Sequence, residues 1–195
     1  MMKAGKTGVS TDTPKNILFG AGTIHKGLKY DATAEKWNFE ESIIGATSGG
    51  SKISIVPEFV DVEADGAMVL VKGLKVKTGE TASMEINLLE LTEEIMKASV
   101  IGKMGTSADT AFNLIESKAD LEEGDYFENI AFVGKKLDGK DIIVIMDNAL
   151  CTSGLESEGK NKEGAIGKYT FECHADLEST LDSLPYHIYY PKKVA

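Results

Sequence analysis

Few side chains in this sequence could carry out chemistry, and most of them lie far apart in the chain. The candidates are two cysteines, Cys151 and Cys173, and three histidines, His25, His174 and His187. Cys173 and His174 are neighbours, which suggests a thiolate–imidazole pair of the kind that activates a nucleophile. Successive residues of a strand point to opposite faces, however, so these two side chains cannot readily share a proton. We expect Cys173 in the core and His174 in solvent, and we predict no catalytic residue and no enzyme.

Three glycines, Gly20, Gly22 and Gly27, resemble a dinucleotide-binding fingerprint at first sight. The third glycine of that motif belongs at position 25, where this chain has a histidine, and we expect no helix or βαβ unit to follow. We therefore predict no cofactor. The glycines are expected to let a strand bend or pack closely against another backbone.

A short acidic stretch suggests a calcium site. It comprises Glu58, Asp61, Glu63 and Asp65. An EF-hand loop also needs a glycine at its sixth position and a bidentate glutamate at its end, and this stretch has neither. We expect a solvated edge or turn instead, and we predict no metal site. The sequence also lacks a P-loop, an HExxH motif and a Cys-x-x-Cys pair.

Composition narrows the function further. The chain has 195 residues, 42% of them hydrophobic and 27% charged, which fits one globular domain. Its net charge is −10 and no basic stripe is visible, which argues against sequence-specific binding of nucleic acid. The two cysteines do not have metal or redox spacing. The sequence leaves open a disulfide between them or, as we expect for assembly in a reducing cytoplasm, two free thiols.

The beginning of the chain has a different composition from the rest. Residues 1–15 contain almost no large apolar side chain, so we expect a flexible N-terminal arm, followed by a single β domain over residues 16–195. This arm has no apolar segment of signal-peptide length. The longest purely apolar run, Ile142–Met146, is too short to cross a bilayer. We therefore expect a soluble protein with no membrane partner.

The elements that would hold these side chains are strands, most clearly over residues 39–91. Ala82, Met84, Ile86 and Leu88 alternate with polar residues between them, and residues 53–59 alternate in the same way. A period of two indicates a half-buried strand, with one apolar and one polar face. Such a sheet has a dry side and a wet side and no evident pocket.

The remaining expected elements follow from turn and capping residues. We expect strands at 16–22, 39–44, 53–60, 68–77, 81–91, 128–136, 140–147, 169–176 and near 186–190. We expect loops at 45–52 and 148–167, and a half-turn or short helix at 111–116. Thr92 followed by two glutamates predicts a short helix over 92–101. Residues 142–146 are apolar on both faces, which indicates a central strand covered on both sides. The predicted fold is mainly β, a β-sandwich or small barrel of two packed sheets with this one flanking helix.

Several segments resemble the tail tube (major tail) proteins of bacteriophages and prophages of Gram-positive hosts. The likeness covers residues 16–100 well, and residues 103–195 match only in general character. The segments are Ile44-Gly45-Ala46-Thr47-Ser48-Gly49-Gly50, Glu58, Asp65-Gly66, Val71-Lys72-Gly73 and Leu91-Thr92-Glu93-Glu94-Ile95.

The resemblance implies a structural virion protein that self-assembles into stacked hexameric rings, with genomic DNA passing through the lumen without sequence-specific binding. It implies contacts with other copies and with other tail proteins: the tape measure, the tail terminator, the baseplate or initiator, and a sheath where one is present. It implies location in the virion tail after assembly in the host cytoplasm. Ser83, Glu85 and Asn87 are the candidates for lining the lumen, which we expect to be negative. The predicted loop with Thr47, Ser48, Gly49, Gly50 and Ser51, together with residues 1–15, is the candidate for contacts between subunits.

Two other classes of function stay open from the residues alone. A soluble β-sandwich binding module for carbohydrate or protein would need an aromatic platform, and the single tryptophan, Trp37, and the scattered tyrosines predict a poor one. An enzyme of another type would need an acid, a base or a nucleophile in a shared site, and no such set is evident.

Overall fold

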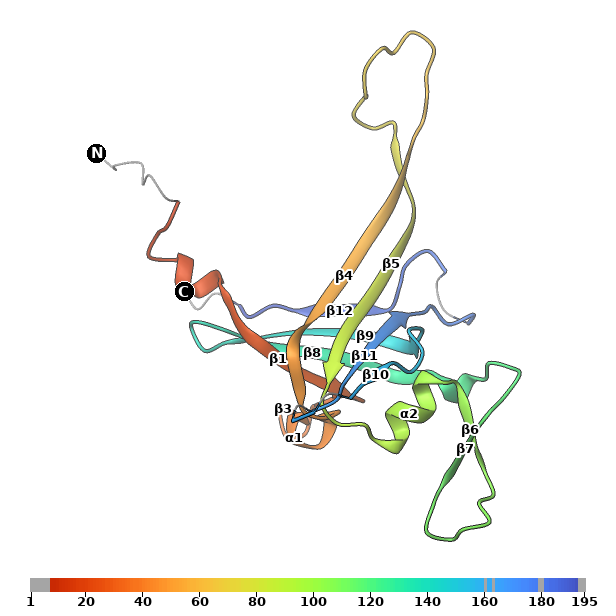
Figure 1. The fold of residues 1–195 in the computed structure, drawn as a ribbon. Coiled ribbons are helices and arrows are strands. Elements are labelled where there is room, and N and C mark those ends of the chain that lie inside the picture. Colours follow the sequence, from red (N-terminus) through yellow and green to blue (C-terminus); the bar gives the residue numbers. More distant parts are fainter. Residues whose placement is uncertain (1–7, 160, 163, 179–180, 193–195) are drawn as a thin grey trace.

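A computed structural model describes residues 8–159, 161–162, 164–178 and 181–192, and it is built almost entirely from strands (Figure 1). The helices are η1 (Thr13–Asn16), α1 (Phe39–Ser42), α2 (Glu93–Ser99) and η2 (Glu123–Asp125). The strands are β1 (Leu18–Lys26), β2 (Tyr30–Asp31), β3 (Lys36–Trp37), β4 (Thr47–Asp61), β5 (Lys75–Leu88), β6 (Gly102–Gly105), β7 (Leu114–Ser117), β8 (Phe127–Lys136), β9 (Asp141–Cys151), β10 (Ser157–Glu158), β11 (Ile166–Cys173) and β12 (Tyr186–Tyr189). No helix among these residues is long and apolar enough to span a membrane.

One antiparallel sheet of eight strands dominates the structure. Its main path is β1-β8-β9-β11-β5-β4, with β10 added beside β11 and β12 added beside β9. The sheet curls until its two ends meet: His25 of β1 bridges to Ile43, and the amide of Ile44 donates to the carbonyl of Ile24 at 3.0 Å. The prediction of a mainly β fold with a short flanking helix is therefore confirmed. The two packed layers belong to this single sheet, which forms a small, partly closed barrel.

The inside of the curled sheet holds the main core. Met84, Ile86 and Leu88 of β5 are completely buried, as their alternation predicts, and they pack with Tyr169 and Phe171 of β11. A second apolar cluster lies on the opposite face of β8 and β9, where Ile143 and Ile145 pack under Trp37 and Phe39. The prediction that strand 142–146 is covered on both sides is confirmed. Apolar burial on this scale is the main favourable term in folding.

Helix α2 covers one end of the core. The Thr92 hydroxyl accepts a hydrogen bond from the Ile95 amide at 3.3 Å, and Glu93 and Glu94 occupy the first turn, where carboxylates favour the helix dipole. Ile95 points into the core and is 1% exposed. The predicted helix is therefore present, with Thr92 as its N-cap.

Four local predictions are wrong. The predicted strand at 39–44 is absent: residues 39–42 form helix α1, in which the buried Ser42 hydroxyl donates back to the Asn38 carbonyl at 2.8 Å. Residues 68–74 form an exposed loop, and the strand begins only at Lys75. Residues 114–117 form β7 rather than a short helix. The predicted loop at 148–167 is shorter, because β9 continues to Cys151 and the short strand β10 interrupts the rest.

Part of the predicted N-terminal arm is structured. Residues 13–16 form η1, whose Lys15 carbonyl accepts a hydrogen bond from the Lys136 ammonium at 2.6 Å. Residues 1–7 lie outside the described part of the chain. Flexibility of the arm and the division into arm and single domain stay predictions.

Two hairpins extend from the curled sheet (Figure 1). The longer one is the outer part of β4 and β5 with the loop at 62–74, and the shorter one is β6–β7. The base of the β6–β7 hairpin is fixed by the Lys118 ammonium, which contacts the carboxylates of Glu122 and Asp125 at 2.7 Å each. Asp125 is buried, which disfavours its charged form, but Lys118 and the Glu122 amide outweigh this effect and lower its pKa.

A close approach between β1 and β8 explains the glycines of the false fingerprint. Gly22 has a φ of +69°, and a Cβ added there would lie 2.4 Å from the ring of Phe132. The pairing of β1 with β8 shifts register between Phe19 and Thr23, at the bend that Gly20 and Gly22 permit.

We expect Gly22→Ala to lower the free energy of unfolding by about 1–3 kcal/mol more than Gly20→Ala does, because only Gly22 lacks room for a side chain. Gly20 also has a positive φ, of +91°, but nothing lies within 4 Å of an added Cβ, so it is the matched control. Urea unfolding followed by circular dichroism measures both. Equal losses for the two variants would contradict the packing explanation.

Candidate functional site

The outer face of β5 carries the predicted lumen residues side by side. Ser83, Glu85 and Asn87 alternate with the buried residues and point away from the core, as expected. In the sheet they lie between β4 and β11: Glu85 pairs with Lys52 on one side and Thr170 on the other. The structure therefore places them together on one polar surface, which we call the polar sheet face and which comprises Lys52, Ser54, Ser83, Glu85, Asn87, Lys168, Thr170 and Glu172.

The residues predicted to form an intersubunit loop border this face. Thr47, Ser48, Gly49, Gly50 and Ser51 belong to β4 and not to a loop. The expectation of a loop fails because the glycines form a bulge within the strand: Gly49 and Gly50 both have positive φ, and the pairing with β5 shifts register between Thr47 and Ser51. Asn87 donates to the Gly50 carbonyl at 3.1 Å, so the two predicted sets are in contact. Their roles in assembly stay predictions.

The charges on the polar sheet face are balanced. The Lys52 ammonium lies 2.5 Å from the Glu85 carboxylate, and Thr152 donates to Glu172 at 3.1 Å. Two lysines and two glutamates occur in the set defined above. The face is therefore polar and close to neutral, not negative as expected, and the acidic excess of the chain lies elsewhere.

His25 is the one titratable side chain with partners on both ring nitrogens. Its Nδ1 lies 2.8 Å from the Ser42 hydroxyl and its Nε2 lies 2.8 Å from the Thr23 hydroxyl. Ser42 donates to the Asn38 carbonyl, so it accepts from Nδ1–H, and Nε2 accepts from Thr23. Burial lowers the pKa of His25, which favours this neutral form. The arrangement is a hydrogen-bonded clamp that joins β1 to α1.

The other histidines and the cysteines do not form a site with it. His174 is half-buried against the ring of Tyr126 rather than solvated, and its Nε2 has no partner among the described atoms. His187 contacts the Asp147 carboxylate at 3.2 Å. Cys151 and Cys173 are free thiols, both buried, and Cys173 lies in the core as expected. No group of three metal-ligating side chains occurs within the described ranges.

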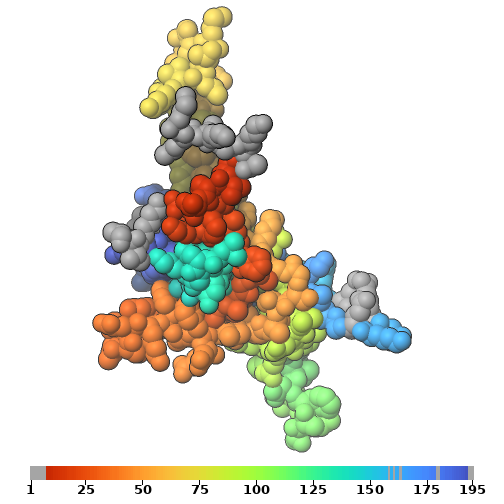
Figure 2. Space-filling view, turned by 90° about the vertical axis from the view of Figure 1, so that its left-hand side faces the viewer, coloured from red at the N-terminus to blue at the C-terminus, as the bar shows by residue number. Residues whose placement is uncertain are grey.

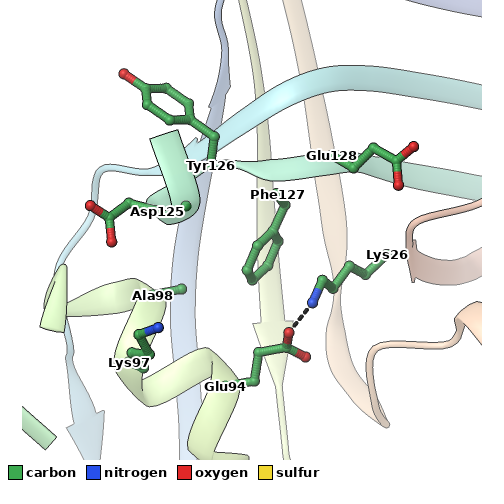
Figure 3. A pocket seen from close by; sticks show the side chains of 9 residues that line it. Lys26, Glu94, Lys97, Ala98, Asp125, Tyr126, Phe127 and Glu128 are labelled. Carbon is green, nitrogen blue, oxygen red and sulfur yellow. Dashed lines mark hydrogen bonds and ion pairs between the residues drawn. The ribbon is translucent and has the colours of Figure 1, made fainter. Parts of the chain in front are cut away.

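A cavity of about 350 Å³ at the end of α2 is occupied by paired charges (Figure 3). Figure 3 shows Lys26 and Glu94 reaching toward each other beside the ring of Phe127, and the Lys26 ammonium lies 4.6 Å from the centre of that ring. These contacts tie α2 to β1 and β8. Because its charged side chains pair with one another across α2, β1 and β8, we assign the pocket a structural role.

Aromatic side chains gather on the outer face of β9, which the sequence did not predict. The Trp37 ring lies 4.9 Å from that of Tyr189 and 5.4 Å from that of Tyr30, both edge-on. Tyr189 and Tyr190 are half exposed and border a cavity of about 240 Å³ with Ile143 at its floor. Residues from three distant segments form this cluster, and the pairing of β12 with β9 brings them together.

The tip of the long hairpin is a surface that the sequence pattern misassigned. Met68, Val69 and Leu70 are 98%, 78% and 79% exposed. Farther down the hairpin, Val56, Phe59 and Val60 are about half exposed. The loop could have been predicted from Asp65-Gly66 and Gly73, which indicate a turn on either side of the short apolar run.

The solved structures similar to this chain include chains of phage-like particles. No protein-family model matches the sequence, and no curated protein matches it significantly. The chain is similar to a chain of "Virion of native gene transfer agent (GTA) particle", with a TM-score of 0.42 and 16% identity over 80% of this chain and 92% of that one. It is also similar to a chain of "Tail of empty GTA particle computed with helical refinement, C6 symmetry", with a TM-score of 0.42 and 17% identity over 82% and 96%. Both TM-scores are below 0.5, so the functional proposal rests on the residues of this chain.

We expect neither native thiol to react with Ellman's reagent in the folded protein. Burial raises the pKa of the Cys173 thiol to about 12 and also raises that of Cys151, so little of the reactive thiolate is present at neutral pH. Both thiols should react once the chain is unfolded in guanidinium chloride. Ala108→Cys, at an exposed position, is the positive control and should react at once. Fast reaction of a native thiol would show that the core opens readily.

Proposed function

We propose that this chain is a non-enzymatic structural subunit of a phage-like tail tube, which assembles into stacked hexameric rings around a lumen that conducts DNA. The observation that carries the proposal is the polar sheet face together with the edge at which it ends. Within the described residues, β4 is 15 residues long and pairs only with β5. A long unpaired edge is a template for pairing with another chain. Pairing of edges between copies would extend the polar sheet face from subunit to subunit.

The long hairpin supports self-assembly independently. A two-stranded ribbon outside a core is marginally stable in water, and this one exposes apolar side chains along its length and at its tip. Contiguous exposed apolar surface of this kind marks an interaction site. We infer that contacts with other copies bury it in the assembled tube.

The near-neutral charge of the polar sheet face fits a channel that DNA must pass without binding. Affinity for the phosphate backbone comes from an excess of Lys and Arg side chains; on this face Lys52 is held by Glu85, and the two lysines are balanced by two glutamates. Ser83, Glu85 and Asn87 are the proposed lumen residues. We propose a location in the virion tail after assembly in the host cytoplasm, with the tape measure, terminator, baseplate or initiator, and sheath as further partners.

The direct test is negative-stain electron microscopy and sedimentation velocity of the purified chain at rising concentration. Rings or hollow tubes are the expected result. A chain that stays monomeric at high concentration, both alone and after addition of preformed ring seeds, would overturn the proposal.

We expect Ser83→Lys combined with Asn87→Lys to make the tubes retain double-stranded DNA, because each subunit would then present two additional ammonium groups, and a net positive charge, to the lumen. Retention should fall steeply with salt. Filter retention of labelled DNA by preformed tubes measures it, and circular dichroism checks the fold.

The matched control for this variant is Thr33→Lys combined with Thr110→Lys, which adds the same charge at exposed positions away from the polar sheet face. Equal DNA retention by the two variants would show that the polar sheet face does not line the lumen.

A second candidate function is carbohydrate binding by the cluster of Trp37, Tyr30, Tyr189 and Tyr190. The observation that favours it is the cavity beside these rings, because aromatic side chains with one exposed face are suited to stacking on sugars. Glycan-array binding that is lost in Tyr189→Ala, by a protein that forms no rings, would favour this function over the tube.

A further inference from the structure

A lysine-rich cavity of about 440 Å³ lies between η1, the turn joining β8 to β9, and the segment after β12. We call it the lysine cavity. Its charged lining consists of Lys15, Lys136, Lys140 and Lys192 with Asp12 and Asp138. Four ammonium groups and two carboxylates give a local excess of positive charge, on a chain whose net charge is −10. An anionic ligand would be attracted to this place and repelled by most of the remaining surface.

The contacts in the cavity show which charges are available. Lys15 pairs with Asp12 at 2.9 Å. Lys136 is buried, donates to the Lys15 carbonyl at 2.6 Å and lies 3.5 Å from the Asp138 carboxylate. These contacts use both carboxylates of the lining.

Two ammonium groups remain without a carboxylate. Lys140 donates to the carbonyl of Lys192 at 3.2 Å, and the Lys192 ammonium makes no ion pair with any residue that the structure describes. Lysine presents a compact point charge with rotatable donors, which suits a carboxylate. The cavity therefore has room and charge for two carboxylates.

The loop of the long hairpin carries two carboxylates that have no ammonium partner among the described residues. Asp61, at the base of the loop, pairs with Lys75 at 2.8 Å within the hairpin. Glu63 and Asp65 lie beyond that pair on the loop at 62–74, are exposed, and make no ion pair with described residues. Met68, Val69 and Leu70 follow directly and are the most exposed apolar run of the hairpin.

Exposed apolar side chains lie beside the lysine cavity, as they do beside the two carboxylates of the hairpin. Ile17, Leu18 and Phe19 follow η1 directly and are 40%, 45% and 69% exposed. Leu137, whose amide donates to the Ile17 carbonyl at 3.0 Å, is also exposed. An apolar rim therefore borders the positive cavity, just as an apolar tip follows the negative part of the hairpin.

The two surfaces do not meet within one molecule. Figure 1 shows the hairpin tip pointing away from η1 and the β8–β9 turn, and in Figure 2 the yellow tip stands apart from the red and cyan residues around the cavity. The cavity on the hairpin side is lined by the hairpin's own residues alone. A contact between a tip and a lysine cavity must therefore join two copies, and when it runs head to tail it generates rings or tubes.

We propose that the lysine cavity of one copy binds the Glu63 and Asp65 carboxylates of another copy, with Met68–Leu70 packed against the apolar rim. This inference rests on the proposed self-assembly and names the surface that receives the hairpin. The contact combines charge complementarity, which sets register and partner choice, with apolar burial, which supplies affinity.

Charge reversal tests the pairing. Glu63→Lys with Asp65→Lys, and separately Lys140→Glu with Lys192→Glu, should each raise the concentration needed for half-maximal assembly about tenfold or more, since like charges then face each other. The two pairs of substitutions combined in one chain should restore most of the loss. Asp120→Lys with Glu178→Lys, at exposed positions away from both surfaces, is the matched control. Alone it should leave assembly nearly unchanged, and combined with the lysine reversals it should not restore the assembly that those reversals weaken.

Cross-linking gives a second readout that does not need stable tubes. A chain with Ala64→Cys mixed with a chain with Lys192→Cys should form a disulfide-linked heterodimer under mild oxidation, since both native thiols are buried. Ala119→Cys in place of Ala64→Cys should give little heterodimer. Tubes or rings that are insensitive to the reversals, with no selective cross-link, would overturn the lysine cavity and leave the proposed function standing. If the unsubstituted chain forms no assembly while the two cysteine variants give the selective cross-link, the result would support the contact and overturn the tube.

Discussion

The closure of the main sheet is the constraint on which the other surfaces depend. The hydrogen bond from Ile44 to Ile24 and the bridge between His25 and Ile43 bring the segment before β4 back to β1. This closure buries His25, whose ring nitrogens then need the hydroxyls of Thr23 and Ser42 as partners. It also fixes the direction in which β4 and β5 leave the barrel. The hairpin that they form, and the polar sheet face at its base, are therefore oriented by a few bonds at the opposite end of β4.

The sequence predicts the parts of this structure that are decided by neighbouring residues. The alternation of Met84 and Ile86 with Ser83 and Glu85 assigns each side chain of β5 to a face, because strand geometry alone decides it. Thr92 and the two glutamates after it locate α2 for the same reason. These local signals were sufficient to predict the fold class and to place the proposed lumen residues on one face.

The features that were missed depend on contacts between distant segments. Gly49 and Gly50 suggested a loop, but pairing with β5 makes them a bulge in a strand. The hydrogen bond between His25 and the Ser42 hydroxyl holds residues 39–42 as a helix, although the segment was predicted to be a strand. Met68–Leu70 has the composition of a strand and becomes a loop because no described strand lies beside it. The aromatic cluster and the lysine cavity each combine residues more than a hundred positions apart, so no local pattern could reveal them.

The position of the single tryptophan has a practical consequence. Trp37 lies on the outer surface of the barrel, where its ring contacts Tyr189 of the last strand and Tyr30 of the small β2–β3 hairpin. It is separate from the main core inside the curled sheet. Its fluorescence therefore reports the docking of the C-terminal strand rather than the integrity of the core. The chain thus contains an intrinsic probe for the pairing of β12 with β9.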